Sequence, residues 1–272
     1  QGELGSYSHL AVNEIYKNSE VIPCKTFDQA LRLTKENEEI KAVIPIENSI
    51  AGRVADVHHL LPKYKLKIIG ESFHKVSHCL IILKGNKLEN IKYIKSHSHA
   101  IGQCHDKINK YKFMPIIETD TAGAAKKLSE EKNMQSAVIA SELAAKIYDL
   151  EVIEKNFEDI SGNTTRFLIM SSDNKDLIAI DKKKKYITTC IFKLKSLPAA
   201  LYKSLGGFAT HNVNLTKLES FTVNNTFDQA LFYLDIEGHF SDPKINAAIQ
   251  VLKKNTESLD ILGVYQASSY RN

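Results

Sequence analysis

The sequence predicts an α/β protein with open, largely parallel sheets, followed by a smaller βαββαβ unit. Strand-like and helix-like segments alternate through about the first 175 residues, which is typical of sheets joined by crossover helices. Polar side chains follow several of these strands, and ligands of open α/β sheets bind at the carboxyl ends of strands. From Tyr186 the order becomes strand, helix, strand, strand, helix, strand, which is a ferredoxin-like plan.

The composition is that of an ordinary globular protein, with 43% hydrophobic and 25% charged residues, and it suits one to three domains. The net charge of +4 comes mostly from scattered lysines, so a nucleic-acid surface is not favoured. No apolar run approaches the roughly 18 residues of a membrane span. The separated cysteines lack a CxxC pair, which indicates reduced thiols and a cytoplasmic protein (Cys24, Cys79, Cys104, Cys190). A chain that starts at Gln1 also leaves open a removed targeting segment, and with it a plastid location.

The first part is expected to alternate short strands with amphipathic helices. Val54, Val57, Leu60 and Leu61, for example, recur at helical spacing. By such patterns we expect helices over 27–37, 52–61, about 100–110, 121–131 and 142–148, and strands over 41–47, 66–73, 78–83, 92–96, 115–119, 136–140 and 167–171.

A polar, charged segment separates the two parts, and we expect it to be a linker over 176–185. Its lysine run, 182–185, is typical of a solvated spacer. The second part then predicts a strand over 186–194 and a helix over 197–212 that Pro198 opens. Paired strands over 214–223 and 228–238, a helix over 242–255 and a strand over 259–266 complete it.

Two glycine- and serine-containing stretches precede helices in the first 60 residues. In GELGSYSHLAV, glycines permit a tight turn, and a serine N-cap leaves backbone N–H groups directed at solvent or an anion. Capping of a helix and binding of a ligand both fit. In IPIENSIAGRV, Glu47, Asn48 and Ser49 follow an apolar strand, at the edge where ligands bind. Asn48 or Ser49 also fits as a helix cap.

Three later stretches place polar residues at strand ends. KSHSHAIGQCHD gathers residue types that zinc prefers (His97, His99, Cys104, His105), but the spacing matches no zinc finger, and a polar helix N-terminus with Gln103 facing a cleft fits better. In ETDTAGAAKKL, Asp120 or Thr121 would cap a helix of small residues. NTTRF, residues 163–167, puts two hydroxyls and a cation before the strand over 167–171. So many polar strand ends exceed what capping requires.

In order along the chain, these motifs resemble those of the prephenate dehydratases: GxxGSYSxxA, IPIENSxAGxV, SHxxAxxQC, DTAGAA, AVIAS with a following AA and Y, and NTTRF. The arogenate dehydratases are similar. LPAAL and NLTKLES resemble the ACT regulatory domain that follows them. The resemblance implies a catalytic domain over 1–175 that looks like a two-lobed type II periplasmic binding protein, with an ACT domain over 186–272. Lobe 1 is expected at about 1–75 and 160–175 and lobe 2 at about 76–159, with chain crossings near 74–79 and 153–161.

The resemblance also implies a reaction, in which prephenate loses CO₂ and water and its ring becomes aromatic. It assigns to Thr165 the role of proton donor to the departing hydroxyl. Because a threonine is a very weak acid, we expect a neighbour or water to resupply its proton. Glu47, Asn48, Ser49 and Gln103 would orient the ring, while Ser6, Ser8 and Thr121 would bind carboxylate. Arg166 beside Phe167 would counter the dianion or, alternatively, form a salt bridge. Neither redox chemistry nor carbanion storage is involved, so we expect no cofactor and no metal.

The C-terminal unit departs from the ACT pattern at two places. The family commonly carries a Gly-Ala-Leu turn and a Glu-Ser-Arg-Pro turn around phenylalanine. Here Leu197 precedes Ala199, Ala200 and Leu201, and Glu219 and Ser220 precede Phe221. A methyl group at Ala199 and the loss of a cation at Phe221 predict weak or absent binding of L-phenylalanine as effector.

Three readings of function compete. They are a prephenate dehydratase, an arogenate dehydratase and a non-enzymatic amino-acid sensor. Thr165, Gln103 and Glu47 together argue against the sensor, because binding alone needs no donor at a leaving hydroxyl. Pairing of ACT sheets would give a homodimer or a homotetramer.

Overall fold

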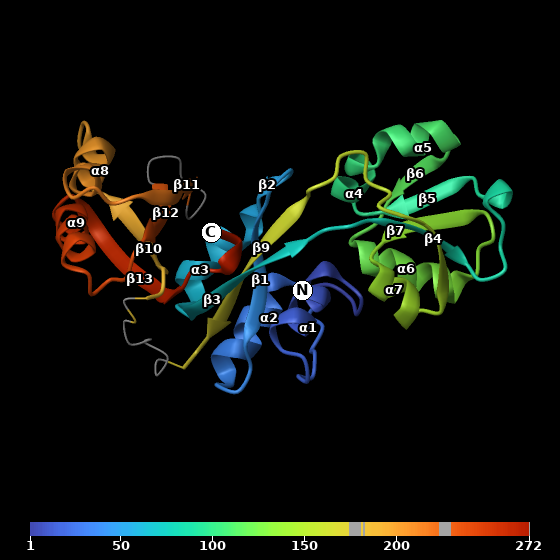
Figure 1. Cartoon of the computed structure of the whole chain (residues 1–272), viewed down its shortest axis with the longest axis horizontal. Helices are drawn as coiled ribbons and strands as arrows, with labels where there is room; N and C mark the ends of the chain where they lie inside the picture. The colour runs from blue at the N-terminus through green and yellow to red at the C-terminus, as the bar shows by residue number, and fades with distance from the viewer. Residues whose placement is uncertain (174–180, 182, 223–229, 272) are drawn as a thin grey trace. The chain divides into compact units, whose positions relative to one another are not determined.

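The computed structural model describes residues 1–173, 181, 183–222 and 230–271 (Figure 1). It is a mixed α/β protein whose described strands form three sheets. The chain divides into two compact units: Gln1–Ala30, Pro45–Arg53 and Phe73–Phe167 form one, and Leu31–Ile44, Val54–Ser72 and Leu168–Asn272 form the other. No helix within the described residues has the length and apolar character to cross a bilayer.

The first unit contains a five-stranded sheet in the order β6-β5-β7-β4-β8. Its strands are β4 (Cys79–Leu83), β5 (Tyr93–Ser96), β6 (Met114–Ile117), β7 (Ser136–Ala140) and β8 (Leu150–Lys155). β5 is parallel to β6 and β7, whereas β4 is antiparallel to β7 and β8. The expectation of a largely parallel arrangement is therefore wrong at β4. β4 enters this sheet from β3 (Lys67–Lys75), which belongs to the other sheet of this part of the chain, so no crossover helix within the sheet sets its direction.

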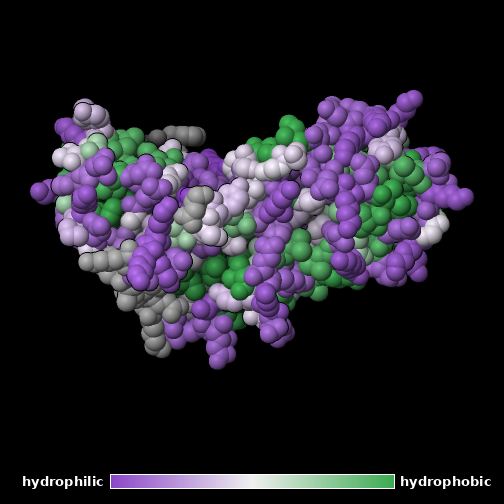
Figure 2. Space-filling model, viewed as in Figure 1, coloured by the Kyte–Doolittle hydropathy of each residue, from purple (hydrophilic) through white to green (hydrophobic). Residues whose placement is uncertain are grey.

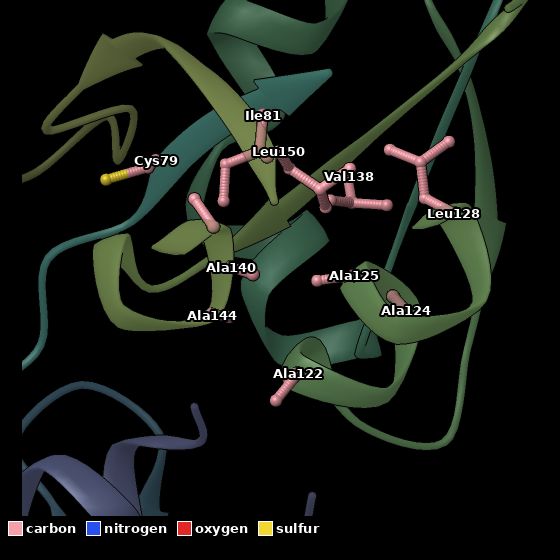
Figure 3. Close-up of a cluster of buried hydrophobic side chains, with 11 residues drawn as sticks. Cys79, Ile81, Ala122, Ala124, Ala125, Leu128, Val138, Ala140, Ala144 and Leu150 are labelled. Atoms are coloured by element: carbon pink, nitrogen blue, oxygen red, sulfur yellow. The ribbon is translucent and has the colours of Figure 1, made fainter. Parts of the chain in front are cut away.

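Helices cover both faces of this sheet. Side chains of β4 point alternately to the two faces, so they pack against helices on both sides. Ile81 packs with α6 (Thr121–Glu131) and α7 (Glu142–Ile147). Figure 3 shows this cluster, in which Ala125 and Leu128 lie beside Val138. Leu80 and Ile82 instead pack with α4 (Ser98–Gln103) and α5 (His105–Tyr111). The single helix expected over about 100–110 is thus two helices, since Cys104 leaves the helical backbone conformation with φ −120° and ψ 21°.

A four-stranded sheet has the order β2-β1-β9-β3, with β1 (Ala42–Asn48), β2 (Gly52–Arg53) and β9 (Thr164–Ser171). β9 begins three residues earlier than expected, so Thr164, Thr165 and Arg166 belong to the strand. β8 was not expected from the sequence, although LEVIEK alternates in burial as a half-exposed strand does. The helices of this part of the chain are α1 (Tyr7–Ile15), α2 (Phe27–Glu36) and α3 (Ala55–Tyr64), with a short 3₁₀ helix at Leu88–Asn90.

The C-terminal segment, within the second unit, follows the expected order of elements. They are β10 (Tyr186–Leu194), α8 (Ala200–Thr210), β11 (Leu215–Thr222), β12 (Ala230–Glu237), α9 (Pro243–Lys254), β13 (Thr256–Gln266) and a 3₁₀ turn at Ser269–Arg271. The sheet is antiparallel, in the order β11-β12-β10-β13, and residues such as Phe208 and Ile249 of α8 and α9 share a core with Leu234. Most of the expected linker lies outside the described residues.

The surface carries few concentrated features. Figure 2 shows hydrophilic side chains over most of the visible face, with smaller apolar areas between them. The large apolar side chains that are most exposed among the described residues, apart from Tyr202, are Ile117 and Ile160, which come from different segments. Single exposed apolar residues of this kind are normal and define no surface site.

Candidate active site

The end of β1 and the start of β9 are joined by a reciprocal pair of hydrogen bonds. Ser49 N donates to Thr164 O over 2.8 Å, and Thr164 N donates to Ser49 Oγ over 2.9 Å. Ser49 therefore binds the backbone at the start of β9. It does not cap α3, whose N-cap residue Val54 makes no side-chain capping bond. These bonds place the IPIENS motif against NTTRF, 115 residues later in the chain.

Asn48 is held in one orientation by its own backbone. Its Oδ1 accepts hydrogen bonds from Ile50 N (3.0 Å) and Ala51 N (2.8 Å). Because the oxygen is engaged there, the amide nitrogen faces the other way. Nδ2 donates to Thr165 Oγ1 over 2.9 Å and to Asn163 Oδ1 over 2.5 Å. The threonine hydroxyl thus accepts a bond from Asn48 and keeps its own hydrogen to donate.

The same chain of hydrogen bonds continues into the neighbouring elements. Asn163 Nδ2 donates to Gln103 Oε1 over 2.8 Å, at the end of α4. His78 Nε2 lies 2.9 Å from that same oxygen, and His78 Nδ1 lies 2.7 Å from Tyr7 Oη. We call this set the amide network, defined by Tyr7, His78, Gln103, Asn163, Asn48 and Thr165. All six residues belong to the first compact unit.

Three members of the amide network were not singled out from the sequence. Tyr7 and Asn163 lie within the GSYS and NTTRF motifs, so the sequence did indicate the segments that contain them. His78 carries no such signal, because nothing in the sequence links it to a glutamine 25 residues away. Only folding of β4 beside the end of α4 brings the two side chains together.

Glu47 and Arg166 form an ion pair, with Arg166 Nη1 3.0 Å from Glu47 Oε1. The arginine side chain is only 1% exposed and the glutamate 32%. Successive residues of a strand point to opposite faces, so this pair lies across the sheet from Asn48 and Thr165. The salt bridge that the sequence left open for Arg166 is the arrangement found. Phe167, the next residue, is buried in the same strand, and its contact with substrate remains a prediction.

The N-terminal turn packs against the start of α7. Gly5 has φ +88°, and a Cβ there would lie 2.6 Å from Ala144 Cα, so only glycine fits. Gly5 O accepts a hydrogen bond from Ser141 Oγ over 2.5 Å. Two motifs distant in sequence, GELGS and AVIAS with its following AA, thus meet in one unit.

The predicted carboxylate ligands occupy helix starts in this region. Ser6 caps α1 by accepting from His9 N over 3.3 Å, and Asp120 rather than Thr121 caps α6 by accepting from Gly123 N over 2.7 Å. Ser8 and Thr121 are half-buried in the first turns of α1 and α6. Their roles toward a substrate remain predictions.

The amide network is uncharged at neutral pH. Burial lowers the pKa of His78, against smaller opposing effects of its bond to Gln103 and of nearby Glu158. Burial likewise raises the pKa of Tyr7 well above its usual value, so its phenol keeps its proton. What this arrangement offers a ligand is a set of neutral donors and acceptors with fixed directions.

The histidines and cysteine of KSHSHAIGQCHD lie in different environments and do not form one site. His97 Nδ1 accepts from His99 N over 3.3 Å and so caps α4, while Cys104 is fully buried, and burial raises the pKa of its thiol. His105 is exposed beside Asp106 on α5. Within the described residues, no cluster of three or more His, Cys, Asp or Glu side chains is arranged to hold a metal ion.

The predicted effector residues lie in the C-terminal segment. Residues 194–202 line an open hollow of about 480 Å³, which includes Leu197, Ala199, Ala200 and Leu201. Glu219 and Ser220 lie on β11 and, in the part of the chain that is described, do not line it. Ala199 has φ +59°, a left-handed conformation that glycine adopts more readily.

The chain combines an α/β fold with a neutral, directional hydrogen-bond network around a threonine hydroxyl, an arrangement that suits a dehydratase. Residues 1–175 match the family model described as prephenate dehydratase, and this chain belongs to that family.

Relatives and solved structures agree with the family. The bifunctional N-acyl-homoserine lactone acylase/prephenate dehydratase of Komagataeibacter europaeus is 38% identical over 100% of this chain and 96% of its own length. Arogenate dehydratase 2 of Petunia hybrida is 34% identical over 99% of this chain and 71% of its own. A prephenate dehydratase structure from Arthrobacter aurescens, solved with L-Phe, has TM-score 0.90 and 27% identity, and covers 100% of this chain and 90% of the other.

A structure described as a novel type of quorum quenching acylase is similar in the same way. It has TM-score 0.92 and 39% identity, and it covers 100% of this chain and 98% of the other.

Proposed function

We propose that this chain converts prephenate to phenylpyruvate, with Thr165 at the departing hydroxyl. The observation that carries the proposal is the bond from Asn48 Nδ2 to Thr165 Oγ1. A hydroxyl that accepts a strong bond polarises its own O–H, which then donates more strongly to a developing hydroxide.

The reaction balances without any further reactant except a proton. The bond between the ring and its carboxylate breaks and releases CO₂, and its electron pair enters the ring. The ring carbon–oxygen bond breaks at the opposite position, and the hydroxyl leaves as water after gaining a proton from solvent. A positioned donor at that oxygen is typically worth roughly 10²–10⁴ in rate. Thr165 bonds the leaving oxygen, and the –NH₂ group of Gln103, whose oxygen is occupied by Asn163 and His78, supplies a second donor.

The finer architecture belongs to the proposal as well. We assign residues 1–175 to a two-lobed catalytic domain of the periplasmic-binding-protein kind, and 186–272 to an ACT domain. The βαββαβ order and the antiparallel sheet support the second assignment. Through that domain the chain would form a homodimer or homotetramer, and L-phenylalanine is the effector class to test.

Arogenate is the second candidate substrate, because arogenate dehydratases align with nearly all of this chain. The two substrates differ only at the side chain, which carries a keto group in prephenate and an amino group in arogenate. Acylase activity enters the test as well, because the name of the Komagataeibacter relative includes it.

The test is an assay of the purified chain with each substrate. We expect phenylpyruvate from prephenate at a higher kcat/KM than phenylalanine from arogenate, and a matched Thr165→Val sample should be nearly inactive with both. A higher kcat/KM for arogenate would replace prephenate as the substrate. Binding of either compound without turnover would support the sensor, and cleavage of an N-acyl-homoserine lactone without dehydration would support the acylase.

A further inference from the structure

His78 is a buried side chain for which the proposed chemistry has so far given no function. It is 3% exposed, its backbone N donates to Glu158 Oε2 over 2.8 Å, and its backbone O accepts from Phe157 N over 2.8 Å. These bonds fix the histidine at the start of β4. Its ring then spans the 2.7 Å contact to Tyr7 Oη and the 2.9 Å contact to Gln103 Oε1.

The directions of the bonds can be assigned from the Asn48 end of the amide network. Two backbone N–H groups occupy Asn48 Oδ1, so Asn48 Nδ2 must donate to Asn163 Oδ1. The Asn163 amide is thereby oriented, and its Nδ2 donates to Gln103 Oε1. Gln103 thus presents its oxygen to both neighbours, and His78 must meet that oxygen with an N–H on Nε2.

The opposite orientation of the Gln103 and Asn163 amides is excluded by the contact between Asn163 and Asn48. If His78 Nε2 lacked a hydrogen, Gln103 would turn its –NH₂ toward the ring and toward Asn163. Asn163 would then have to turn as well, and its –NH₂ would oppose the –NH₂ of Asn48. Two donors facing each other at 2.5 Å are not tolerated, so the anchored Asn48 excludes this state.

We infer that His78 is a positioning residue that, through its Nε2–H, holds the Gln103 amide with its –NH₂ directed at the substrate. The inference rests on the proposed function and deepens it, because Gln103 is the second donor to the leaving oxygen. Tyr7 completes the arrangement at Nδ1: its hydroxyl oxygen lies 2.7 Å from that nitrogen and 3.0 Å from Ser77 O, and the Nε2–H tautomer requires that its one hydrogen is donated to the nearer Nδ1. Burial keeps His78 neutral, and the Nε2–H form is the neutral tautomer that the network requires.

Two substitutions separate the donor from the bulk of the ring. The amide nitrogen of glutamine reaches about as far as Nε2, whereas that of asparagine reaches only as far as Nδ1. We expect His78→Asn to lower kcat roughly 10- to 100-fold with little change in KM, because a misdirected group costs that much in rate. We expect His78→Gln to retain kcat within about threefold of the wild type. The exposed His105→Gln variant is the matched control and should be unchanged.

A double-substitution cycle asks whether His78 acts through Gln103. In a Gln103→Ala background, His78→Asn should lower kcat by less than about twofold, since the group to be positioned is gone. Equal losses in His78→Asn and His78→Gln, or multiplicative losses with Gln103→Ala, would overturn the inference. So would a folded His78→Asn enzyme with wild-type kcat. If the wild type dehydrates neither substrate, the proposed function fails, and the inference fails with it.

Discussion

Asn48 donates from Nδ2 to Thr165 Oγ1 over 2.9 Å, and this one bond joins two motifs 117 residues apart. The proposed mechanism depends on this bond, because a threonine is too weak an acid to protonate a leaving group alone. The Thr165 hydroxyl then does not need to transfer its own proton completely. In the proposed mechanism, the amide polarises the hydroxyl, which donates a strengthened hydrogen bond to the leaving oxygen while solvent supplies the proton.

Removal of the hydroxyl at Thr165 tests its place in the chemistry. Valine has the same shape, so Thr165→Val should fold normally and lose roughly 100-fold or more in kcat, with a modest change in KM. Steady-state kinetics with prephenate measures both. Thr165→Ser, which keeps the hydroxyl, is the control and should retain most of the activity. An unchanged kcat in the valine variant would remove Thr165 from the reaction.

Reversal of the donor at position 48 tests polarisation. Asn48→Asp keeps the acceptor for Ile50 N and Ala51 N but places an oxygen opposite Thr165 Oγ1 and Asn163 Oδ1. At pH 7 the carboxylate would take the threonine hydrogen as an acceptor, and kcat should fall roughly 100-fold. Asn48→Ala, which removes the donor without reversing it, should lose less. A smaller loss in the aspartate variant than in the alanine variant would contradict the bond direction.

The ion pair between Glu47 and Arg166 should be asymmetric in its effect on stability. Arg166 is almost completely buried, whereas Glu47 reaches solvent. Glu47→Leu removes one carboxylate partner of a buried cation and should lower the free energy of unfolding by up to about 3 kcal/mol, while Arg166→Met leaves a carboxylate that water can reach and should cost less. Urea unfolding at pH 7 compares the two. Equal losses would mean that burial of the arginine does not set the cost.

Acid should destabilise the fold as three histidines take up protons. Burial lowers the pKa of His9, His78 and His97 from the usual value of about 6.5, so the unfolded chain binds more protons than the folded one below that pH. Their stabilising contribution is complete above pH 6.5 and is lost as pH falls through the lowered values. The temperature of unfolding should therefore drop between pH 7 and pH 5, with a smaller drop in His78→Gln. Equal drops in the two proteins would exclude His78 as a contributor.

Binding of L-phenylalanine should be weak or absent in calorimetry. Phe221, where the resemblance leads one to expect arginine, is buried with its ring 5.7 Å from those of His58 and His59 of α3. It packs within the fold and offers a ligand no charge. Micromolar binding would contradict this expectation.

The substitution Ala199→Gly tests whether the left-handed backbone at position 199 is strained. Glycine relieves the left-handed backbone at φ +59°, so the variant should be more stable by about 1 kcal/mol. Thermal unfolding measures the gain. No gain in stability would show that the methyl group at this position carries no strain.

The order of elements was predictable because local patterns determine it. The strand over 186–194 and the helix over 121–131 have the bounds that their apolar spacing and caps predict. The direction of β4 was not predictable, since strand pairing depends on partners distant in sequence. The split at Cys104 and the early start of β9 likewise depend on burial against neighbouring elements.

The sequence by itself determined the motifs and their chemical types: hydroxyls, amides and a few charges at the ends of strands. Tertiary structure alone decided which of them touch. It paired Arg166 with Glu47 on one face of β9 and Thr165 with Asn48 on the other, and it brought His78 to Gln103. The reason is physical: a hydrogen bond is made within about 3 Å, a distance that a linear motif does not encode.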